Sequence, residues 1–325
     1  MSKPKVGFYW CASCGGCEES VVDLAEGLLD VVAAVDLVFF PVAMDFKRED
    51  VEAMADGEMA VCFVNGAIRS DEQREMAELL RAKSQLLIAY GSCSHQGGIP
   101  GLANLYSHES LMKYVYEESP STVNPEKVRP APETAVPEGA TVTLPELDHE
   151  VKCLDQVVDV DYYIPGCAPP VSLLSNAVTA VLEDKLPPKG TVLAPDVALC
   201  KECPRIDTKP ADISLAELKR PSLAELDPEI CLLTQGFLCM GPATRSGCGA
   251  VCMAANMPCT GCLGPVSHAK DHGGAFIGAL GSILSPENEE EIDALLEQIP
   301  DPAGTFYRYG LPASRLFARH NRATT

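Results

Sequence analysis

Apolar and polar positions alternate in blocks along the first 90 residues. Short apolar runs of the kind that form buried strands are each followed by a longer segment with apolar residues three or four positions apart, the spacing of an amphipathic helix. This pattern predicts strands over residues 6–10, 36–42, 60–64 and 85–90, and helices over residues 18–32, 49–55 and 71–82. Because strands and helices alternate strictly, we expect an α/β fold with a parallel sheet covered by helices on both faces.

The alternation returns later, with a strand predicted over residues 157–164 and a helix over residues 171–186. Before that strand, residues 119–150 are rich in Pro, Glu, Thr and Val and interrupt the pattern as a long insertion. An insertion of this length is either a mobile surface loop or a loop that docks a partner. The sequence does not decide between these two roles.

The segment LPPKG at residues 186–190 ends the regular pattern, and we place a domain boundary there. Residues 1–188 are expected to form a flavodoxin-like domain, and residues 189–325 an irregular, cysteine-rich domain. Near the end, a short helix is predicted over residues 287–298, with Pro286 at its start. A length of 325 residues and 46% hydrophobic residues are sufficient for two packed domains.

The formal net charge of −21 argues against nucleic acid as a partner, because phosphates would be repelled. The chain begins without an apolar signal core or a twin-Arg pair, and no uncharged apolar run reaches the length of a membrane span. We therefore expect a cytoplasmic location, where reducing conditions keep thiols free to bind metal.

Four cysteines share one position relative to the predicted strands. Cys14 and Cys17 follow the first strand, Cys93 follows the strand that ends at residue 90, and Cys167 follows the strand that ends at residue 164. Because ligands of parallel sheets lie outside the carboxyl ends of the strands, we expect these thiols to converge. Four thiolates fit a 4Fe-4S cluster or a tetrahedral zinc ion. The neighbouring glycines favour the cluster, since they let backbone N–H groups approach its sulfides.

Eight further cysteines are concentrated in the second domain, enough for two more sets of four: Cys200, Cys203, Cys231, Cys239, Cys248, Cys252, Cys259 and Cys262. Their spacing also allows two structural zinc sites. The end of this run carries few charges and several Gly and Pro residues, which is more typical of loops that bind clusters. Of the 15 cysteines, this leaves Cys11, Cys62 and Cys153, and Cys62 is expected to be a small core residue of a strand.

Three motifs of the first domain, W-x3-C-G-G-C-E, G-S-C-x3-G-G-I-P-G and P-G-C-A-P-P, resemble the small subunit of nickel-iron hydrogenases and its relative in respiratory complex I. The segment CLLTQGFLCMGPATRSGCGAVCMAANMPCTGCLGP resembles the small (gamma) subunit of cytosolic methyl-viologen-reducing, deazaflavin-non-reducing hydrogenases, which deliver electrons to heterodisulfide reductase. The complex I relative has an adjacent cysteine pair. Here Gly15 and Gly16 separate Cys14 from Cys17, which favours the hydrogenase family.

The resemblance implies that Cys14, Cys17, Cys93 and Cys167 hold a proximal cluster facing a large subunit that carries nickel and iron. The other eight cysteines would hold medial and distal clusters, and their division stays open. The chain would thus contain three 4Fe-4S clusters, no nickel and no catalytic residue of its own. It would relay electrons from H2 oxidation to an iron-sulfur or flavin-bearing acceptor subunit of the heterodisulfide reductase type.

Two alternatives come from other interpretations of the same cysteines. The chain could be the iron-sulfur relay of a non-hydrogenase oxidoreductase, if its large partner lacks nickel ligands. It could also be an interaction subunit stabilised by zinc, without redox activity. Visible absorption of iron-sulfur clusters and the sequence of the large partner would distinguish these possibilities.

Other polar residues near the motifs have two interpretations each. Glu18 or Glu19 could take part in proton movement, as the resemblance implies, or be helix N-terminal carboxylates favoured by the dipole. His95 could donate a hydrogen bond to the cluster or be a plain loop residue. The basic end of the chain could dock a partner or be a frayed terminus, and its arginines are Arg308, Arg315, Arg319 and Arg322.

Overall fold

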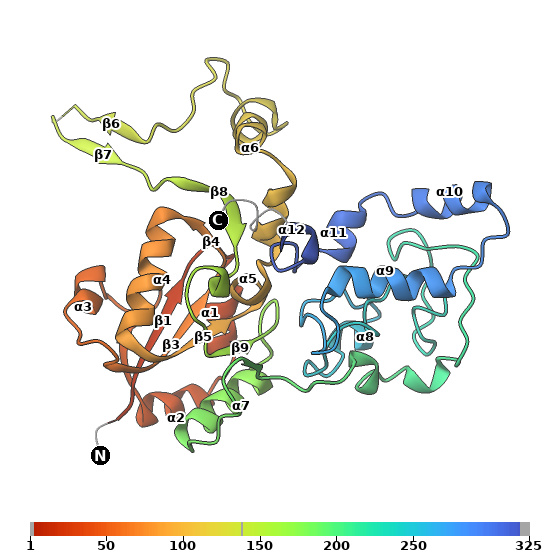
Figure 1. Cartoon of the computed structure of the whole chain (residues 1–325), viewed down its shortest axis with the longest axis horizontal. Helices are drawn as coiled ribbons and strands as arrows, with labels where there is room; N and C mark the ends of the chain where they lie inside the picture. Colours follow the sequence, from red (N-terminus) through yellow and green to blue (C-terminus); the bar gives the residue numbers. More distant parts are fainter. Residues whose placement is uncertain (1–2, 138, 319–325) are drawn as a thin grey trace.

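The computed structural model describes residues 3–137 and 139–318. Six parallel strands form the central sheet, in the order β10-β9-β5-β3-β1-β2 (Figure 1). They are β1 (Lys5–Trp10), β2 (Asp36–Phe39), β3 (Met59–Asn65), β5 (Ser84–Tyr90), β9 (Tyr162–Ile164) and β10 (Thr191–Val192). Counted along the chain, this is the 2-1-3-4-5 order of flavodoxin-like sheets with one more strand at the edge. The predicted α/β fold is confirmed.

Helices cover both faces of the sheet. One face carries α1 (Gly16–Val22), α2 (Gly27–Ala34) and α7 (Val171–Leu182), and the other carries α3 (Arg48–Glu52) and α4 (Asp71–Lys83). Neighbouring residues of β3 point to opposite faces of the sheet. Phe63 packs in the core under α1, α2 and α7, and Val64 packs in the core under α3 and α4. This alternation follows from the two-residue period of a strand.

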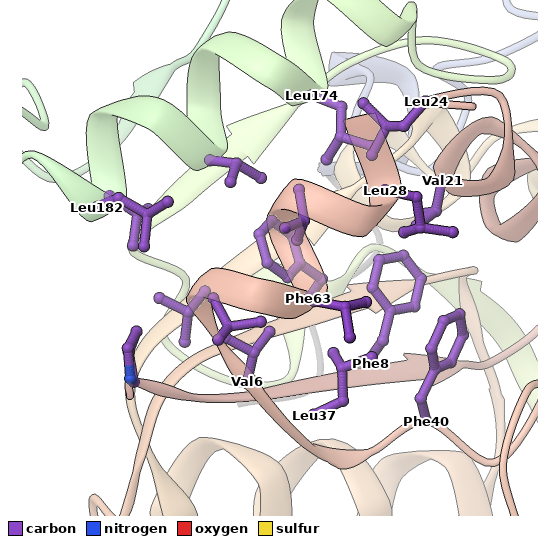
Figure 2. A pocket seen from close by; sticks show the side chains of 17 residues that line it. Val6, Phe8, Val21, Leu24, Leu28, Leu37, Phe40, Phe63, Leu174 and Leu182 are labelled. Carbon is purple, nitrogen blue, oxygen red and sulfur yellow. The ribbon is translucent and has the colours of Figure 1, made fainter. Parts of the chain in front are cut away.

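An apolar pocket of about 80 Å³ lies between the sheet and the helices α1, α2 and α7. Figure 2 shows that Phe8 and Phe63 of the sheet face it from one side, and Leu28 and Leu174 of the helices from the other. Every side chain that lines this cavity is apolar. Val32 and Leu182 of its lining are partly exposed, so it is an apolar pocket that opens to the surface between the helices.

Two elements of the first half are shorter than the sequence pattern predicts. The helix expected over residues 18–32 is two helices, α1 and α2, because Ala25 between them has a left-handed φ of 51°. The strand expected over residues 36–42 ends at Phe39, shortly before Pro41, which has no N–H to donate to a neighbouring strand. The apolar pattern alone does not show either break.

Two later elements also differ from expectation. The strand predicted over residues 157–164 forms only as β9, because Val157 has helical dihedral angles (φ −119°, ψ −45°) after a single turn at Leu154–Gln156. The helix predicted up to residue 186 ends at Leu182, before Asp184 with its positive φ of 53°. Both differences arise from local backbone geometry next to the sheet.

The insertion forms an arm beside the sheet. After α6 (His108–Lys113), strands β6 (Glu133–Ala135) and β7 (Thr141–Thr143) make an exposed antiparallel hairpin that points away from the sheet (Figure 1). The chain returns as β8 (Leu147–Lys152), which pairs with β4 (Ile68–Ser70). Arg129 forms ion pairs with Glu109 at 2.9 Å and Glu117 at 2.5 Å, which holds the base of the arm.

The second half of the chain is mostly loops around a separate hydrophobic core. Its helices are α8 (Val251–Ala254), α9 (His272–Ile283), α10 (Glu289–Glu297), α11 (Pro302–Phe306) and α12 (Arg315–Ala318). The sequence pattern did not predict α9, which contains four glycines that weaken the helical signal. None of the helices in the described ranges has the length and apolar character needed to span a bilayer.

Helix α10 corresponds to the predicted helix over residues 287–298, but its start differs. Asn288 is the N-cap, and its side chain accepts a hydrogen bond from the Glu291 N–H at 3.0 Å. Pro286 therefore lies before the helix, and its predicted place at the helix start is wrong.

Candidate metal centres

The first four cysteines lie together at the carboxyl ends of three sheet strands. We call Cys14, Cys17, Cys93 and Cys167 the inner set. They follow β1, β5 and β9, and Cys93 lies in the short helix α5 (Ser92–Gln96). The pKa of the Cys93 thiol is raised to about 12, mainly by burial and then by the nearby Cys167 and Cys14 thiols. Burial and then Cys93 likewise raise the pKa of Cys17.

Two glycines bring the backbone against these sulfurs. Gly91 has a φ of 88°, and a Cβ at this position would overlap the Cys17 Sγ atom. Gly98 has a φ of 57°, and a Cβ there would overlap the Cys93 Sγ atom. Only glycine allows this approach, which a cluster needs if backbone N–H groups are to reach its sulfur atoms. The donors and the cradle of the inner set fit a 4Fe-4S cluster.

Four cysteines of the second half surround one small cavity of about 20 Å³, and we call them the outer set: Cys200, Cys203, Cys231 and Cys239. Gly241 lies between two of them, since a Cβ there would be 3.5 Å from the Cys200 Sγ and 3.6 Å from the Cys239 Sγ. Burial raises the pKa of Cys200 to about 11, while the positive charge of Lys209 opposes this shift. The structure thus groups these four thiols around one space, whereas the sequence leaves the division of the eight cysteines open.

The remaining four cysteines form the middle set: Cys248, Cys252, Cys259 and Cys262. The pKa of Cys262 is raised to about 12, mainly by burial, with smaller contributions from the nearby Cys248 and Cys252 thiols. Cys259 is buried and lies near both Cys239 and Cys262. It completes the middle set because the outer set already has four members around its cavity.

Direct contacts join the three sets in a row. The Cys262 thiol lies close to Cys167, which brings the inner and middle sets together. The Cys259 N–H donates to the Cys239 Sγ at 3.4 Å, which links the middle and outer sets. In addition, the Ser92 hydroxyl donates to the Cys262 carbonyl oxygen at 2.6 Å. The middle set therefore lies between the other two.

Within residues 3–137 and 139–318, no three His, Cys, Asp or Glu side chains are close enough together to hold one metal ion. A single zinc ion needs its ligand sulfurs about 2.3 Å from one centre. A four-iron cluster needs a wider cage, because each of its four thiolates binds a different iron.

The cysteines outside the three sets are buried in the protein. Cys62 lies in β3 among core side chains, which agrees with its expected role as a small apolar residue. Cys11 follows the end of β1 and Cys153 precedes the turn before β9. Burial raises the pKa of all three thiols, so they stay neutral at physiological pH.

Glu18 and Glu19 differ in their surroundings. Glu18 is buried beside Cys17 and accepts a hydrogen bond from the Asn65 side chain, while Glu19 is exposed. Burial raises the pKa of Glu18, and the bond from Asn65 opposes this shift. Asn65 was not predicted from the sequence, although it ends β3 and obeys the same carboxyl-end rule as the inner set.

His95 is half-buried and lies two residues after Cys93, and its ring is 4.8 Å from the ring of Tyr163. Burial lowers its pKa to about 4, so the imidazole is neutral near pH 7. Of the basic residues near the end, Arg308 donates to the Gly304 carbonyl oxygen at 3.1 Å and the Arg315 N–H donates to Asp271 at 2.8 Å. Arg319 and Arg322 lie outside the described residues.

Comparison with known proteins relates this chain to hydrogenases and to complex I. Residues 14–181 match the family described as NADH ubiquinone oxidoreductase, 20 Kd subunit. The iron-sulfur subunit of the F420-non-reducing hydrogenase of Archaeoglobus profundus is 39% identical over 96% of this chain and 97% of its own. A subunit of the F420-non-reducing hydrogenase of Methanothermobacter thermautotrophicus is 36% identical, over 96% of each chain.

A solved structure supports the fold. The NiFeSe hydrogenase from Desulfovibrio vulgaris Hildenborough aligns with 82% of this chain and 94% of its own, at a TM-score of 0.52 and 16% identity. At this identity the likeness concerns the fold alone. The sequence relatives, in contrast, match along nearly the whole length, so the chain belongs to the small-subunit family of F420-non-reducing nickel-iron hydrogenases.

Proposed function

We propose that this chain is an electron relay, in which three 4Fe-4S clusters carry electrons from H2 oxidation in a nickel-iron large subunit to an acceptor subunit. The observation that carries this proposal is the row of three four-cysteine sets, joined by the contacts from Ser92 to Cys262 and from Cys259 to Cys239. Each cluster would supply one-electron chemistry, and the chain would hold the clusters in order and close together.

The inner set is the side that would face the large subunit. Cys14 and Cys167 are exposed, whereas Cys17 and Cys93 are buried, so a cluster held by all four would have one open side. Trp10 at the end of β1 is 39% exposed, and Ile99, shortly after the helix that carries Cys93, is 47% exposed. Exposed apolar side chains beside a cluster are what a subunit interface would cover.

The outer set is the side from which electrons would leave. It lies farthest along the row from the inner set, and Cys200, Cys203 and Cys231 are each partly exposed. An iron-sulfur or flavin-bearing subunit of the heterodisulfide reductase type fits this place as acceptor. The two-domain division at about residue 188, the three-cluster content and a cytoplasmic location belong to the same proposal.

The test is anaerobic purification of the native assembly, followed by metal analysis and a hydrogen-dependent dye-reduction assay. We expect about twelve iron atoms for each copy of this chain, counted as three four-iron clusters. Nickel should be found in a large subunit that purifies with it, and H2 should reduce the dye. Zinc in place of iron would contradict the relay. Iron without nickel or hydrogen activity would indicate a relay of another oxidoreductase.

Two cysteine variants provide a matched comparison in the same assembly. Cys239→Ser removes a thiol of the outer set and should lower the iron content by about four atoms, the content of one cluster. Cys62→Ala removes a buried thiol that belongs to none of the three sets and should leave the iron content unchanged. Equal iron loss in both variants would mean that the sets are assigned incorrectly.

A further inference from the structure

Arg205 is a buried cation in the loop of the outer set. Its side chain is 4% exposed and lies two residues after Cys203. The guanidinium donates to the carbonyl oxygens of Asp227 at 3.1 Å, Ile230 at 3.3 Å and Met253 at 2.9 Å, and to the Asn256 Oδ1 at 2.9 Å. All four acceptors are neutral groups.

Arg245 provides the contrast within the same half of the chain. It is also 4% exposed, but its guanidinium forms an ion pair with Asp196 at 3.1 Å. In the part of the chain that the structure describes, Arg205 forms no such pair. Burial of a charge is unfavourable, and the four hydrogen bonds of Arg205 offset this cost without supplying a negative charge, so a nearby anion would stabilise the guanidinium further.

The hydrogen bonds of Arg205 place it among the cysteine loops. Ile230 directly precedes Cys231 of the outer set, and Met253 directly follows Cys252 of the middle set. A four-iron cluster bound by four thiolates is negatively charged, and reduction adds one further negative charge. We propose that Arg205 is the counter-charge of the cluster held by the outer set, and that it favours the reduced form of that cluster.

This inference rests on the proposed function, because it needs an iron-sulfur cluster in the outer set. Its sign follows from charge alone: removal of a fixed cation makes the addition of an electron less favourable and lowers the reduction potential. Lys209 is a second cation near this set, but it is partly exposed and screened by water. Arg205 is buried, so water screens its charge less than that of Lys209.

The test uses the anaerobic hydrogenase assembly and a potentiometric titration followed by electron paramagnetic resonance. The signal of the outer cluster is identified as the one that Cys231→Ser removes. In Arg205→Met, we expect the reduced-to-oxidised ratio of this cluster at a fixed potential to fall about tenfold, equivalent to about 59 mV for a one-electron couple. Arg205→Lys keeps the charge and should restore most of the potential.

Arg245→Met is the matched control, because the charge that it removes is already paired with Asp196. It should shift the outer cluster less than Arg205→Met does. An unchanged potential in Arg205→Met with full iron content would overturn the proposal. If Arg205→Met and Arg205→Gln both lose the outer cluster while Arg205→Lys keeps it, the charge is needed to retain the cluster, which supports the proposal.

If Arg205→Lys also loses the outer cluster, the hydrogen bonds of the guanidinium hold the loop and the counter-charge proposal is wrong. These outcomes are separate from a failure of the proposed function. That failure would be visible in the unmodified assembly, as absence of the iron and of the resonance signal of the outer cluster.

Discussion

Gly91 and Gly98 set how closely the backbone approaches the sulfurs of the inner set. Each has a positive φ and a Cys Sγ in the place where a side chain would begin. A thiol ligand can be moved by a rotation about its own side-chain bonds, but the backbone beside it has no such freedom. The glycines therefore define the geometry of this site as strictly as the cysteines do.

We predict that Gly91→Ala prevents normal assembly of the inner cluster. The added Cβ would overlap Cys17 Sγ, and the φ of 88° is unfavourable for alanine. The purified assembly should lose about four iron atoms, the content of one cluster, together with hydrogen-dependent dye reduction. Gly57→Ala is the control, since its φ is also positive (69°) but the nearest atom to its Cβ, Gln85 Cγ, is 3.8 Å away. Full iron content in Gly91→Ala would contradict this prediction.

The sequence was sufficient to find the cysteines of the inner set because one topological rule applies to all of them. Each follows a strand of the same parallel sheet, so their convergence is a property of the fold. The division of the other eight was not predictable, because Cys200 and Cys203 join Cys231 and Cys239 across loops without periodic pattern. Asn65 obeys the rule of the inner set, but an amide is not a cluster ligand, so the cysteine pattern does not point to it.

At the scale of elements, strand and helix types were predictable and their ends were not. The apolar period identifies β1, β3, β5, α4 and α7. In these elements the spacing of the apolar residues is set by which faces are buried. The ends depend on single backbone conformations, such as the positive φ of Ala25 between α1 and α2. The edge strand β10 has only two residues, too few for any period to be visible.

Asp161 shows how one side chain connects several elements at the edge of the sheet. Its carboxylate accepts from Arg81 of α4 at 2.6 Å and from the Leu87 N–H of β5 at 2.8 Å, and it forms an ion pair with Lys189, near β10, at 2.6 Å. Burial acts to raise the pKa of Asp161, but the bonds from Lys189 and Arg81 outweigh it, so the pKa is lowered.

We predict that Asp161→Asn weakens the β5–β9 edge by about 2 kcal/mol near pH 7, the range for lost hydrogen bonds to a charged group. A lowered pKa means that the carboxylate stabilises the fold above its unfolded pKa, and that this contribution is lost as the pH falls through the folded pKa. The difference between variant and unmodified chain should therefore shrink in acid. Hydrogen exchange of the β5 amides measures it without removing the clusters.

The exposed pair Glu183–Lys185 offers a control for Asp161→Asn. Its two side chains are 51% and 73% exposed, so Glu183→Gln should change the exchange free energy by less than about 0.5 kcal/mol. If Asp161→Asn had an equally small effect near pH 7, the three contacts of the carboxylate would not stabilise this edge.

At the scale of the whole molecule, the two halves hold themselves together by different means. The first half has a six-stranded sheet with apolar cores on both faces. The second half has few regular elements, and its core contains Cys239 and Cys259, with Cys203, Cys231 and Cys248 packed against it. Ligands of the proposed clusters are thus also core residues of this half, so binding and folding should be coupled there.

We therefore predict that removal of iron unfolds the second half locally while the sheet persists. After anaerobic chelation, the slow hydrogen exchange of residues 199–262 should be lost, because the buried thiols lose the iron that links one loop to another. The amides of β3 and β5 should keep most of their protection. Of the thiols in the middle and outer sets, only Cys248 and Cys262 contact the cores around these strands, and they do so at one face of the sheet.

Equal protection of residues 199–262 with and without iron would show that their hydrophobic core is sufficient alone. Equal loss in both halves would show instead that the Cys262–Ser92 contact joins them into one cooperative unit.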